Sequence, residues 1–565
     1  MLHRLLFENP APIFTVIFLL AFTVLRRFRK EHTTQVRNLG LSFGIVAVLA
    51  YLCVLVMNAT RGGLLWHDEA NILSIAASWR NGQPMYQAAN SAQFTTLFYG
   101  PATYLAYAPF LHATPHSLLL LRILVSFADL ASIALLFGVL RAWLPAGESF
   151  ALLSIAIVVL LCYPDELLGI RGDPLLVLLS SLALFLAIRT PPRWAIAAMV
   201  LAGIAIGLAI DLKATVVPIM CVVVAIAFYR LGRTSALAAA SAASVVALGI
   251  FALHGISLPN YIHSLQLASH QPFLRSTCLL NLFVVFVLLL PSLHLRWRRI
   301  ARAGRRRGEF NVLLLTLLAI GVCVGTGSKF SAGPWHLWPL IPFLLAAGAY
   351  ELSTASSGER RTDEAHLTEA ARTLNPETTI AILQRKTAQI AALAIAGGVA
   401  ALFFCAQDVH LLRPLDSRAF RTSELADVVE LQQDVAADHA RTLVMGSGSN
   451  LDDERTNLRY ELPLAGERYI FDENEVVEAR KESLGVPSAT IAQIRACAED
   501  WLIPHGDAPF SAIRSGLVPG DSSAPMFPDD LRAAFLANYS LLRQGTAYDL
   551  WGCRDRSTVV KASLY

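Results

Sequence analysis

Long apolar runs dominate this sequence and limit what the chain can fold into. They lie at 11–27, 41–57, 118–141, 150–163, 173–189, 195–210, 213–230, 235–253, 279–295, 310–326, 336–351 and 388–405. A membrane-spanning helix needs about 20 predominantly apolar residues, and most of these runs reach or approach that length. Only 16% of the residues are charged, whereas soluble domains carry about 25%. The pattern predicts an all-α polytopic membrane domain with about 12 transmembrane helices.

The distribution of basic residues predicts how these helices are oriented. Basic residues gather in every second loop, at 26–30, 189–193, 230–233, 296–307 and 385–386. Loops rich in Lys and Arg stay on the cytoplasmic side. The N-terminus and the other loops should then face the periplasm or exterior of a bacterial inner (plasma) membrane. The net charge of +4 follows from this topology and does not indicate nucleic-acid binding.

The composition becomes polar at about Ala406, which divides the chain into a membrane domain, 1–405, and a tail domain, 406–565. The tail has helical periodicity at 423–439 and near 488–497 and 529–536, with short strand-like segments at 442–445 and 469–471. We expect a small soluble α/β domain on the outer side. The two cysteines of the tail, Cys497 and Cys553, would lie in an oxidising compartment, so we predict that they form a disulfide.

Two adjacent acids, Asp68 and Glu69, stand in the outer loop at 58–117. A charge near a bilayer is costly to keep, so such residues are candidates for function. The Asp68 carboxylate could serve as a general base for a hydroxyl or bind a hard divalent cation. A structural alternative is equally supported, because the stretch at 70–80 could form a helix and Asp is favoured at helix N-caps.

Asp173 belongs to the segment Gly169-Ile-Arg-Gly-Asp-Pro174, which opens another apolar run on the same outer side. Pro at the first helical position makes Asp173 a good N-cap. Two carboxylates from different loops on one face could also flank one substrate or one metal ion. Asp68 and Asp173 are therefore the candidate catalytic residues and the candidate ligands of a divalent metal ion.

Four basic side chains accompany these acids on the outer side. Lys329 and His336 lie in the loop at 327–339, and Arg171 and Lys213 lie in two others. Such groups could stabilise a phosphate whose negative charge grows as it leaves. The alternative is anchoring at the lipid headgroups, since two tryptophans flank His336. Lys213 stands out because it occupies a very short turn between two apolar runs.

The order of these outer segments resembles that of the GT-C class of polytopic membrane glycosyltransferases, above all the bacterial branch of protein O-mannosyltransferases and aminoarabinose transferases. The resemblance covers roughly 66–350. It rests on short motifs: Trp66-His-Asp-Glu-Ala with Gly82-Gln-Pro-Met-Tyr86, Tyr99-Gly-Pro-Ala-Thr-Tyr104, Arg171-Gly-Asp173, Gly207-Leu-Ala-Ile-Asp-Leu-Lys213, and Gly327-Ser-Lys329 with His336-Leu-Trp-Pro339.

The resemblance implies a polyprenyl-phosphate-linked sugar as donor and a glycan, lipid or protein as acceptor. Asp68 would deprotonate the acceptor hydroxyl, Asp173 would share the site, and the anomeric centre would be inverted. The residues implied in substrate binding are Glu69, Tyr86, Tyr99, Arg171, Lys213, Lys329 and His336. A divalent metal ion at Asp68 and Asp173 is an alternative stabiliser of the phosphate. A lipid-linked donor also agrees with the topology, because no nucleotide-sugar pool is expected outside the inner membrane.

A multi-pass transporter or flippase of a lipid-linked or small polar substrate is the main alternative. Transporters place ionisable residues near the bilayer midplane, often in broken helices of repeated halves. Here the apolar runs hold almost no charges and the acids gather at one end. This distribution favours an enzyme that acts at the membrane surface.

Overall fold

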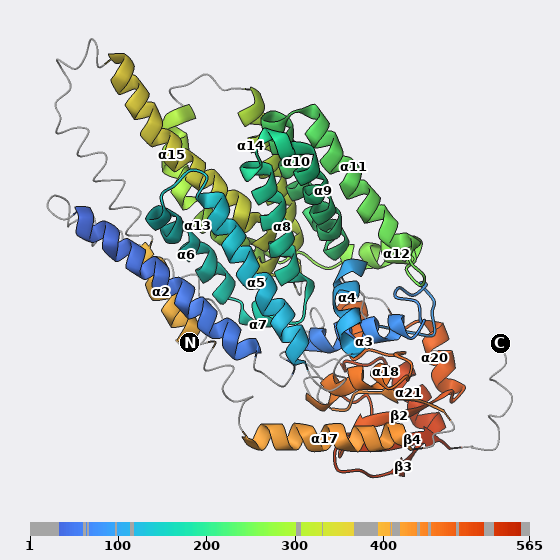
Figure 1. Ribbon diagram of the computed structural model, residues 1–565. Helices are drawn as coiled ribbons and strands as arrows, with labels where there is room; N and C mark the ends of the chain where they lie inside the picture. The colour runs from blue at the N-terminus through green and yellow to red at the C-terminus, as the bar shows by residue number, and fades with distance from the viewer. Residues whose placement is uncertain are drawn as a thin grey trace.

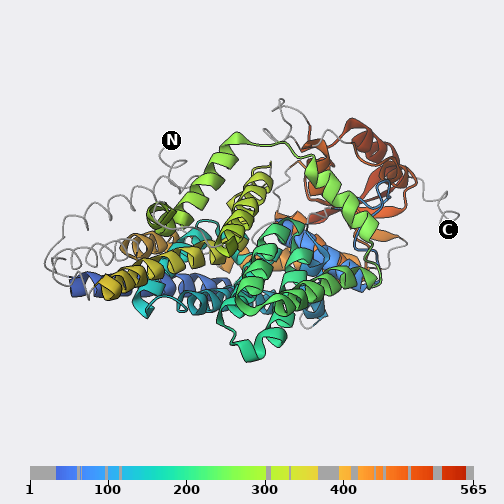
Figure 2. The same cartoon turned by 90° about the horizontal axis from the view of Figure 1, so that it is seen from above.

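A computed structural model of the chain describes residues 33–59, 64, 67–95, 99–112, 118–300, 307–329, 332–366, 394–406, 408, 418–437, 441–449, 454–481, 485–512 and 525–554. A bundle of long helices makes up most of it, and a small mixed domain lies against one end of the bundle (Figure 1). The view from above in Figure 2 shows the same division. The helix expected at 11–27 and the basic cluster at 26–30 lie outside the described residues.

The apolar runs predicted between 41 and 351 all coincide with helices. The long helices of the bundle are α2 (Thr33–Ala59), α5 (Leu119–Leu140), α6 (Ala146–Leu161), α8 (Gly172–Arg189), α9 (Ala195–Leu212), α10 (Val217–Leu231), α11 (Arg233–Gly249), α13 (Arg275–Ile300), α14 (Arg307–Gly327) and α15 (Ile341–His366). Among the described residues, six helices are long and apolar enough to cross a membrane, and four more apolar helices are shorter, including Ala394–Ala406. The expected number of spans, about twelve, stays a prediction.

Small residues let α9 and α11 pack closely. Gly203 and Gly207 lie one turn apart on α9; a Cβ on Gly203 would overlap the carbonyl oxygen of Ala239, and one on Gly207 would press against Val246. Glycines at this spacing allow helix backbones to approach each other in lipid. Large apolar side chains such as Phe127 point outward and are exposed, as expected on a surface that faces lipid.

One end of the bundle carries the short elements. They are α3 (His67–Arg80), α4 (Pro101–Tyr107), η2 (Ala108–His112), α7 (Pro164–Leu168), η4 (Ala214–Val216), α12 (Leu258–Ser269) and η6 (Pro334–Leu340). Helix α3 crosses this end of the bundle instead of running along it (Figure 1). The short apolar segment at 102–111 forms α4 and η2. Gly100 precedes α4 and touches α9, where a Cβ would overlap the carbonyl oxygen of Asp211.

The tail domain is built around a four-stranded sheet. Its strands are β1 (Thr442–Met445), β2 (Glu499–Pro504), β3 (Tyr539–Arg543) and β4 (Tyr548–Cys553), in the order β1-β2-β4-β3. Strands β1 and β2 are parallel, and the other pairs are antiparallel. The helical elements are α17 (Arg418–Ala436), η8 (Glu454–Tyr460), α18 (Glu461–Leu464), α19 (Glu473–Lys481), α20 (Ser488–Arg495) and α21 (Asp529–Asn538). Helices α17, α20 and α21 match the three predicted ones.

One predicted strand of the tail is real and the other is wrong. The segment at 442–445 is β1. The segment at 469–471 forms no strand, because Phe471 makes only an isolated bridge, and its partner is Phe94 in the loop between α3 and α4. The backbone at Phe471 therefore pairs with the membrane domain and not with the sheet of the tail domain.

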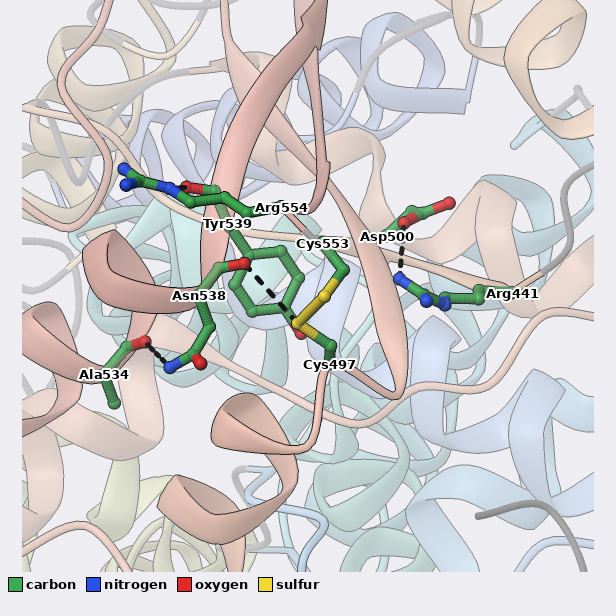
Figure 3. The surroundings of a disulfide bond; sticks show 8 residues. All are labelled: Arg441, Cys497, Asp500, Ala534, Asn538, Tyr539, Cys553 and Arg554. Atoms are coloured by element: carbon green, nitrogen blue, oxygen red, sulfur yellow. Dashed lines mark hydrogen bonds and ion pairs between the residues drawn. A yellow bond between two sulfur atoms is a disulfide. The ribbon is translucent and has the colours of Figure 1, made fainter. Parts of the chain in front are cut away.

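The predicted disulfide is present in the tail. Cys497 follows α20 and is bonded to Cys553 at the end of β4, with a Cα–Cα distance of 5.5 Å, and Figure 3 shows how the bond ties the two segments together. Beside it, Trp501 makes edge-to-face contacts with Phe471, Phe510 and Phe535. Such aromatic pairs are favourable beyond their buried area, so the tail has an apolar core of its own.

Candidate active site

Asp68 lies in the first turn of α3, at the end of the bundle that faces the tail domain. Helix α3 begins at His67, so Asp68 is already inside the helix and does not occupy the N-cap position. The positive end of the helix dipole favours a carboxylate there. The side chain of Asp68 is 28% exposed, which leaves its carboxylate accessible.

Arg171 is the centre of the cluster around Asp68. Its Nη1 lies 3.2 Å from Asp68 Oδ2 and 3.9 Å from Glu166 Oε1, and its Nε lies 3.5 Å from Asp173 Oδ2. The same Nε donates a hydrogen bond of 2.9 Å to the hydroxyl of Tyr99. The structure thus brings Asp68 of α3 and Asp173 of α8 to one guanidinium group.

Asp173 also binds the second cation of the cluster. Lys213 Nζ donates a hydrogen bond of 2.9 Å to Asp173 Oδ1. Asp173 lies in the first turn of α8, whose N-cap is Arg171, so the predicted capping role is wrong. Its side chain is only 1% exposed, so Arg171 and Lys213 take the place of water as partners of its negative charge. Arg171 and Lys213 both lie against the ring of Tyr99, 5.8 and 5.9 Å from the centroid.

Burial and charge set the protonation of the aromatic and imidazole groups here. Burial raises the pKa of Tyr99 well above its usual value, although Arg171 opposes that shift. Burial, together with Lys213, Arg171 and Lys329, holds the pKa of His336 well below its usual value. His336 is therefore neutral at physiological pH, and its Nδ1 has no hydrogen-bond partner among the described residues.

Lys329 is anchored at the edge of this cluster. Its Nζ donates hydrogen bonds to the carbonyl oxygens of Ser269 (2.7 Å) and Ala268 (3.2 Å). These carbonyls end α12, where a cation is favoured by the helix dipole. Lys329 thus holds α12 against the loop that carries His336, while its charge acts on His336 from there.

Two residues expected in substrate binding, Glu69 and Tyr86, make buried contacts inside the protein. Glu69 is completely buried and forms a bidentate ion pair with Arg122 of α5. Tyr86 is also completely buried, and its hydroxyl donates to the carbonyl oxygen of Tyr99. Their polar groups are used inside the protein, because an unpaired buried group would be costly. Their role in substrate binding stays a prediction.

A divalent metal ion does not fit the acids as they are arranged. Arg171 stands between Asp68 and Asp173, and Lys213 takes the other oxygen of Asp173. No group of three or more His, Cys, Asp or Glu residues suited to a metal occurs in the described part of the chain. Hard cations bind sets of oxygen ligands, whereas these oxygens are neutralised by side-chain cations.

The bundle, the crossing helix and the small domain together form a GT-C-like fold. The chain is similar to the crystal structure of ArnT from Cupriavidus metallidurans bound to undecaprenyl phosphate, with a TM-score of 0.51 and 14% identity over 90% of this chain and 97% of that one. The apo structure of the same ArnT gives a TM-score of 0.51 and 13% identity over the same shares. No protein-family model matches the chain, and no curated protein matches it by sequence.

Three residues important to this geometry were not among the sequence candidates. Arg122 is buried in the first turn of α5 and holds both Glu69 and the carbonyl oxygen of Leu168. An arginine inside an apolar run is itself a signal of function or pairing. Asn71 and Arg459 meet between the two domains, and nothing in their local sequence indicates that contact.

Proposed function

We propose that the protein is a glycosyltransferase that moves a sugar from a polyprenyl-phosphate donor to an acceptor hydroxyl at the outer face of the membrane. The observation that carries this proposal is the accessible Asp68 carboxylate beside the Arg171–Asp173–Lys213 cluster. A base next to concentrated positive charge suits a reaction in which a hydroxyl attacks and a phosphate leaves. The GT-C-like fold, which is shared with a protein whose structure contains undecaprenyl phosphate, supports the choice of donor.

In the proposed reaction, Asp68 accepts the proton of the acceptor hydroxyl while its oxygen attacks the anomeric carbon. The bond between that carbon and the phosphate oxygen breaks, and its electron pair stays on the polyprenyl phosphate. One displacement of this kind inverts the anomeric centre. Asp68 suits the role of base because its carboxylate is partly exposed, whereas Asp173 is buried between two cations.

The leaving phosphate would be stabilised by Arg171 and Lys213. Both cations are held in place by Asp173 and by the ring of Tyr99. Fixed charges need little reorganisation when negative charge develops on the phosphate. Neutral His336 can donate a hydrogen bond from a ring nitrogen without adding another positive charge to the cluster.

The outer face is proposed from two observations. Arg189, Arg193, Arg230 and Arg233 belong to the ends of the spans opposite to the site, and loops rich in arginine stay in the cytoplasm. The disulfide between Cys497 and Cys553 suits an oxidising compartment. A bacterial inner membrane with the site and the tail on its periplasmic side satisfies both conditions.

The test is transfer by purified protein in liposomes that contain a radiolabelled polyprenyl-phosphate sugar and candidate acceptors. Wild type should consume the donor and release polyprenyl phosphate, and Asp68→Asn should lower turnover by about 10²–10⁴-fold. Asp529→Asn is the matched control, because Asp529 is an exposed acid in the first turn of a helix remote from the site. A flippase would move the intact donor between leaflets. The proposal would be contradicted if wild type left the donor intact with every acceptor tested. Normal turnover in Asp68→Asn would also contradict it.

A further inference from the structure

A buried polar network joins the tail domain to the helix that carries Asp68. Arg459, in η8, is almost completely buried. Its Nε donates a hydrogen bond of 2.9 Å to Asn71 Oδ1 on α3, and its Nη2 donates to the same oxygen. Its Nη1 donates to Glu473 Oε1 at 3.1 Å. One guanidinium therefore connects α3 to α19 of the tail.

Asn71 is placed so that this contact acts on the start of α3. It lies three residues after Asp68, and residues at that spacing share a face of a helix. Its side-chain oxygen also accepts a hydrogen bond of 3.3 Å from the Tyr469 hydroxyl of the tail. Charge-assisted bonds of a buried guanidinium are strong and directional, so they limit the freedom of α3 to shift or rotate.

The tail also holds the segment that follows α3. Phe94 N donates to the carbonyl oxygen of Ile470 at 2.6 Å, and Asp472 N donates to that of Phe94 at 2.8 Å. The side chain of Phe94 is packed in the apolar core of the tail. Five residues further on is Tyr99, whose hydroxyl binds Arg171. The tail thus contacts both ends of the segment that runs from Asp68 to Tyr99.

We propose that Arg459 is a positioning residue, which through Asn71 holds Asp68 at its distance from Arg171. The tail domain is then part of the framework of the active site and not an appendage to it. Arg459 acts on α3 through its hydrogen bonds to Asn71. The catalytic readout of this inference rests on the proposed transferase function, whereas its structural readout does not.

The first test uses Asn71→Ala, which removes the link on the α3 side and leaves the pairing of Arg459 with Glu473 intact. Ser74→Ala is the matched control, because Ser74 is equally buried on α3 but donates to the carbonyl oxygen of Ala70 in its own helix. We expect Asn71→Ala to lower kcat by about 10–100-fold, the effect of a displacement of about 1 Å. The affinity for polyprenyl phosphate should stay within a factor of two or so of wild type, since the basic residues are unchanged.

The second readout is hydrogen exchange of the α3 amides in the full-length protein in lipid nanodiscs. Asn71→Ala should speed exchange over residues 68–80 by about tenfold, and Ser74→Ala should not. Equal exchange in the two variants, or an equal loss of kcat, would overturn the proposal. If wild type transfers no sugar from any polyprenyl-phosphate donor, the proposed function fails, and the exchange comparison alone decides whether Arg459 positions α3.

Discussion

Arg122 and Glu69 form a bidentate ion pair in which neither side chain is exposed to solvent, with distances of 2.6 Å (Nη1–Oε1) and 3.0 Å (Nη2–Oε2). Glu69 Oε1 also accepts a hydrogen bond of 2.6 Å from the backbone N–H of Ile170. Arg122 in turn donates to the carbonyl oxygen of Leu168. The pair therefore fixes Asp68, the neighbour of Glu69, relative to Arg171, the neighbour of Ile170.

Glu69→Gln should destabilise the protein more than Asp68→Asn, the substitution of the neighbouring residue. Removing one charge of a buried pair leaves the other unpaired, which costs about 3–5 kcal/mol. We expect a lower melting temperature and loss of turnover in Glu69→Gln, but an unchanged melting temperature in Asp68→Asn. Thermal unfolding in detergent, read by tryptophan fluorescence, measures both. Wild-type stability of Glu69→Gln would show that the pair does not hold the loops.

Asp173→Asn and Lys213→Ala should affect donor binding in opposite directions. Lys213→Ala removes a proposed charged partner of the phosphate, and a hydrogen bond to a charged group is worth about 1.5–3 kcal/mol, or about 10–100-fold in affinity. Asp173→Asn frees the charge of Lys213, so polyprenyl phosphate should bind at least as tightly while turnover falls. Binding to protein in nanodiscs measures this. Arg193→Ala, at the opposite end of the bundle, is the control.

How far the sequence predicts this molecule depends on which residues carry the signal. Lipid forces the backbone into helices, so the apolar runs were sufficient to locate α2 and the spans that follow. Strands β2 and β4 were missed because they carry buried acids, Glu499, Asp500 and Asp549, where a short strand usually has apolar residues. Long-range packing, which no local pattern records, makes those acids tolerable.

The site shows the same limit. The acids and cations of the site were found because charges stand out beside a bilayer, and the structure does gather Asp68, Asp173, Arg171 and Lys213. What each one contacts could not be predicted. Glu69 is next to Asp68 in the chain, but successive residues of a helix point in different directions, so one faces Arg122 inside the protein and the other faces the site.

The stability of the tail should fall as the pH rises from about 4.5 to 7. Burial raises the pKa of Glu499 from 4.5 to about 7, so the folded state binds more protons than the unfolded one across this window. The stabilisation is complete at lower pH and is lost at higher pH, and it amounts to at most about 3 kcal/mol. Glu499→Gln should remove that dependence and stabilise the tail at pH 8. Hydrogen exchange of β2 against pH measures it, with Asp529→Asn as the control.

Removal of the disulfide should loosen the tail. The bond closes a loop of 56 residues in sequence, and its loss is expected to cost about 4 kcal/mol. The double variant Cys497→Ala/Cys553→Ala should therefore show faster hydrogen exchange in β2 and β4. Exchange in α5 and α8 should be unchanged, because these two helices pack against each other within the bundle. If β2 and β4 exchanged at the same rates with and without the disulfide, the bond would contribute nothing to the stability of the tail.

The side of the membrane decides which donor is available, so the topology prediction bears on the chemistry. Asp529 of the tail and Arg193, at the other end of the bundle, are both exposed, and a cysteine at either position can react with a maleimide that does not cross membranes. In a background that lacks the six free cysteines but keeps the disulfide, we expect Asp529→Cys to be labelled in intact spheroplasts. Arg193→Cys should be labelled only after permeabilisation. The reverse pattern would put Asp68 and Arg171 in the cytoplasm, where nucleotide sugars are present, and a lipid-linked donor would lose its topological support.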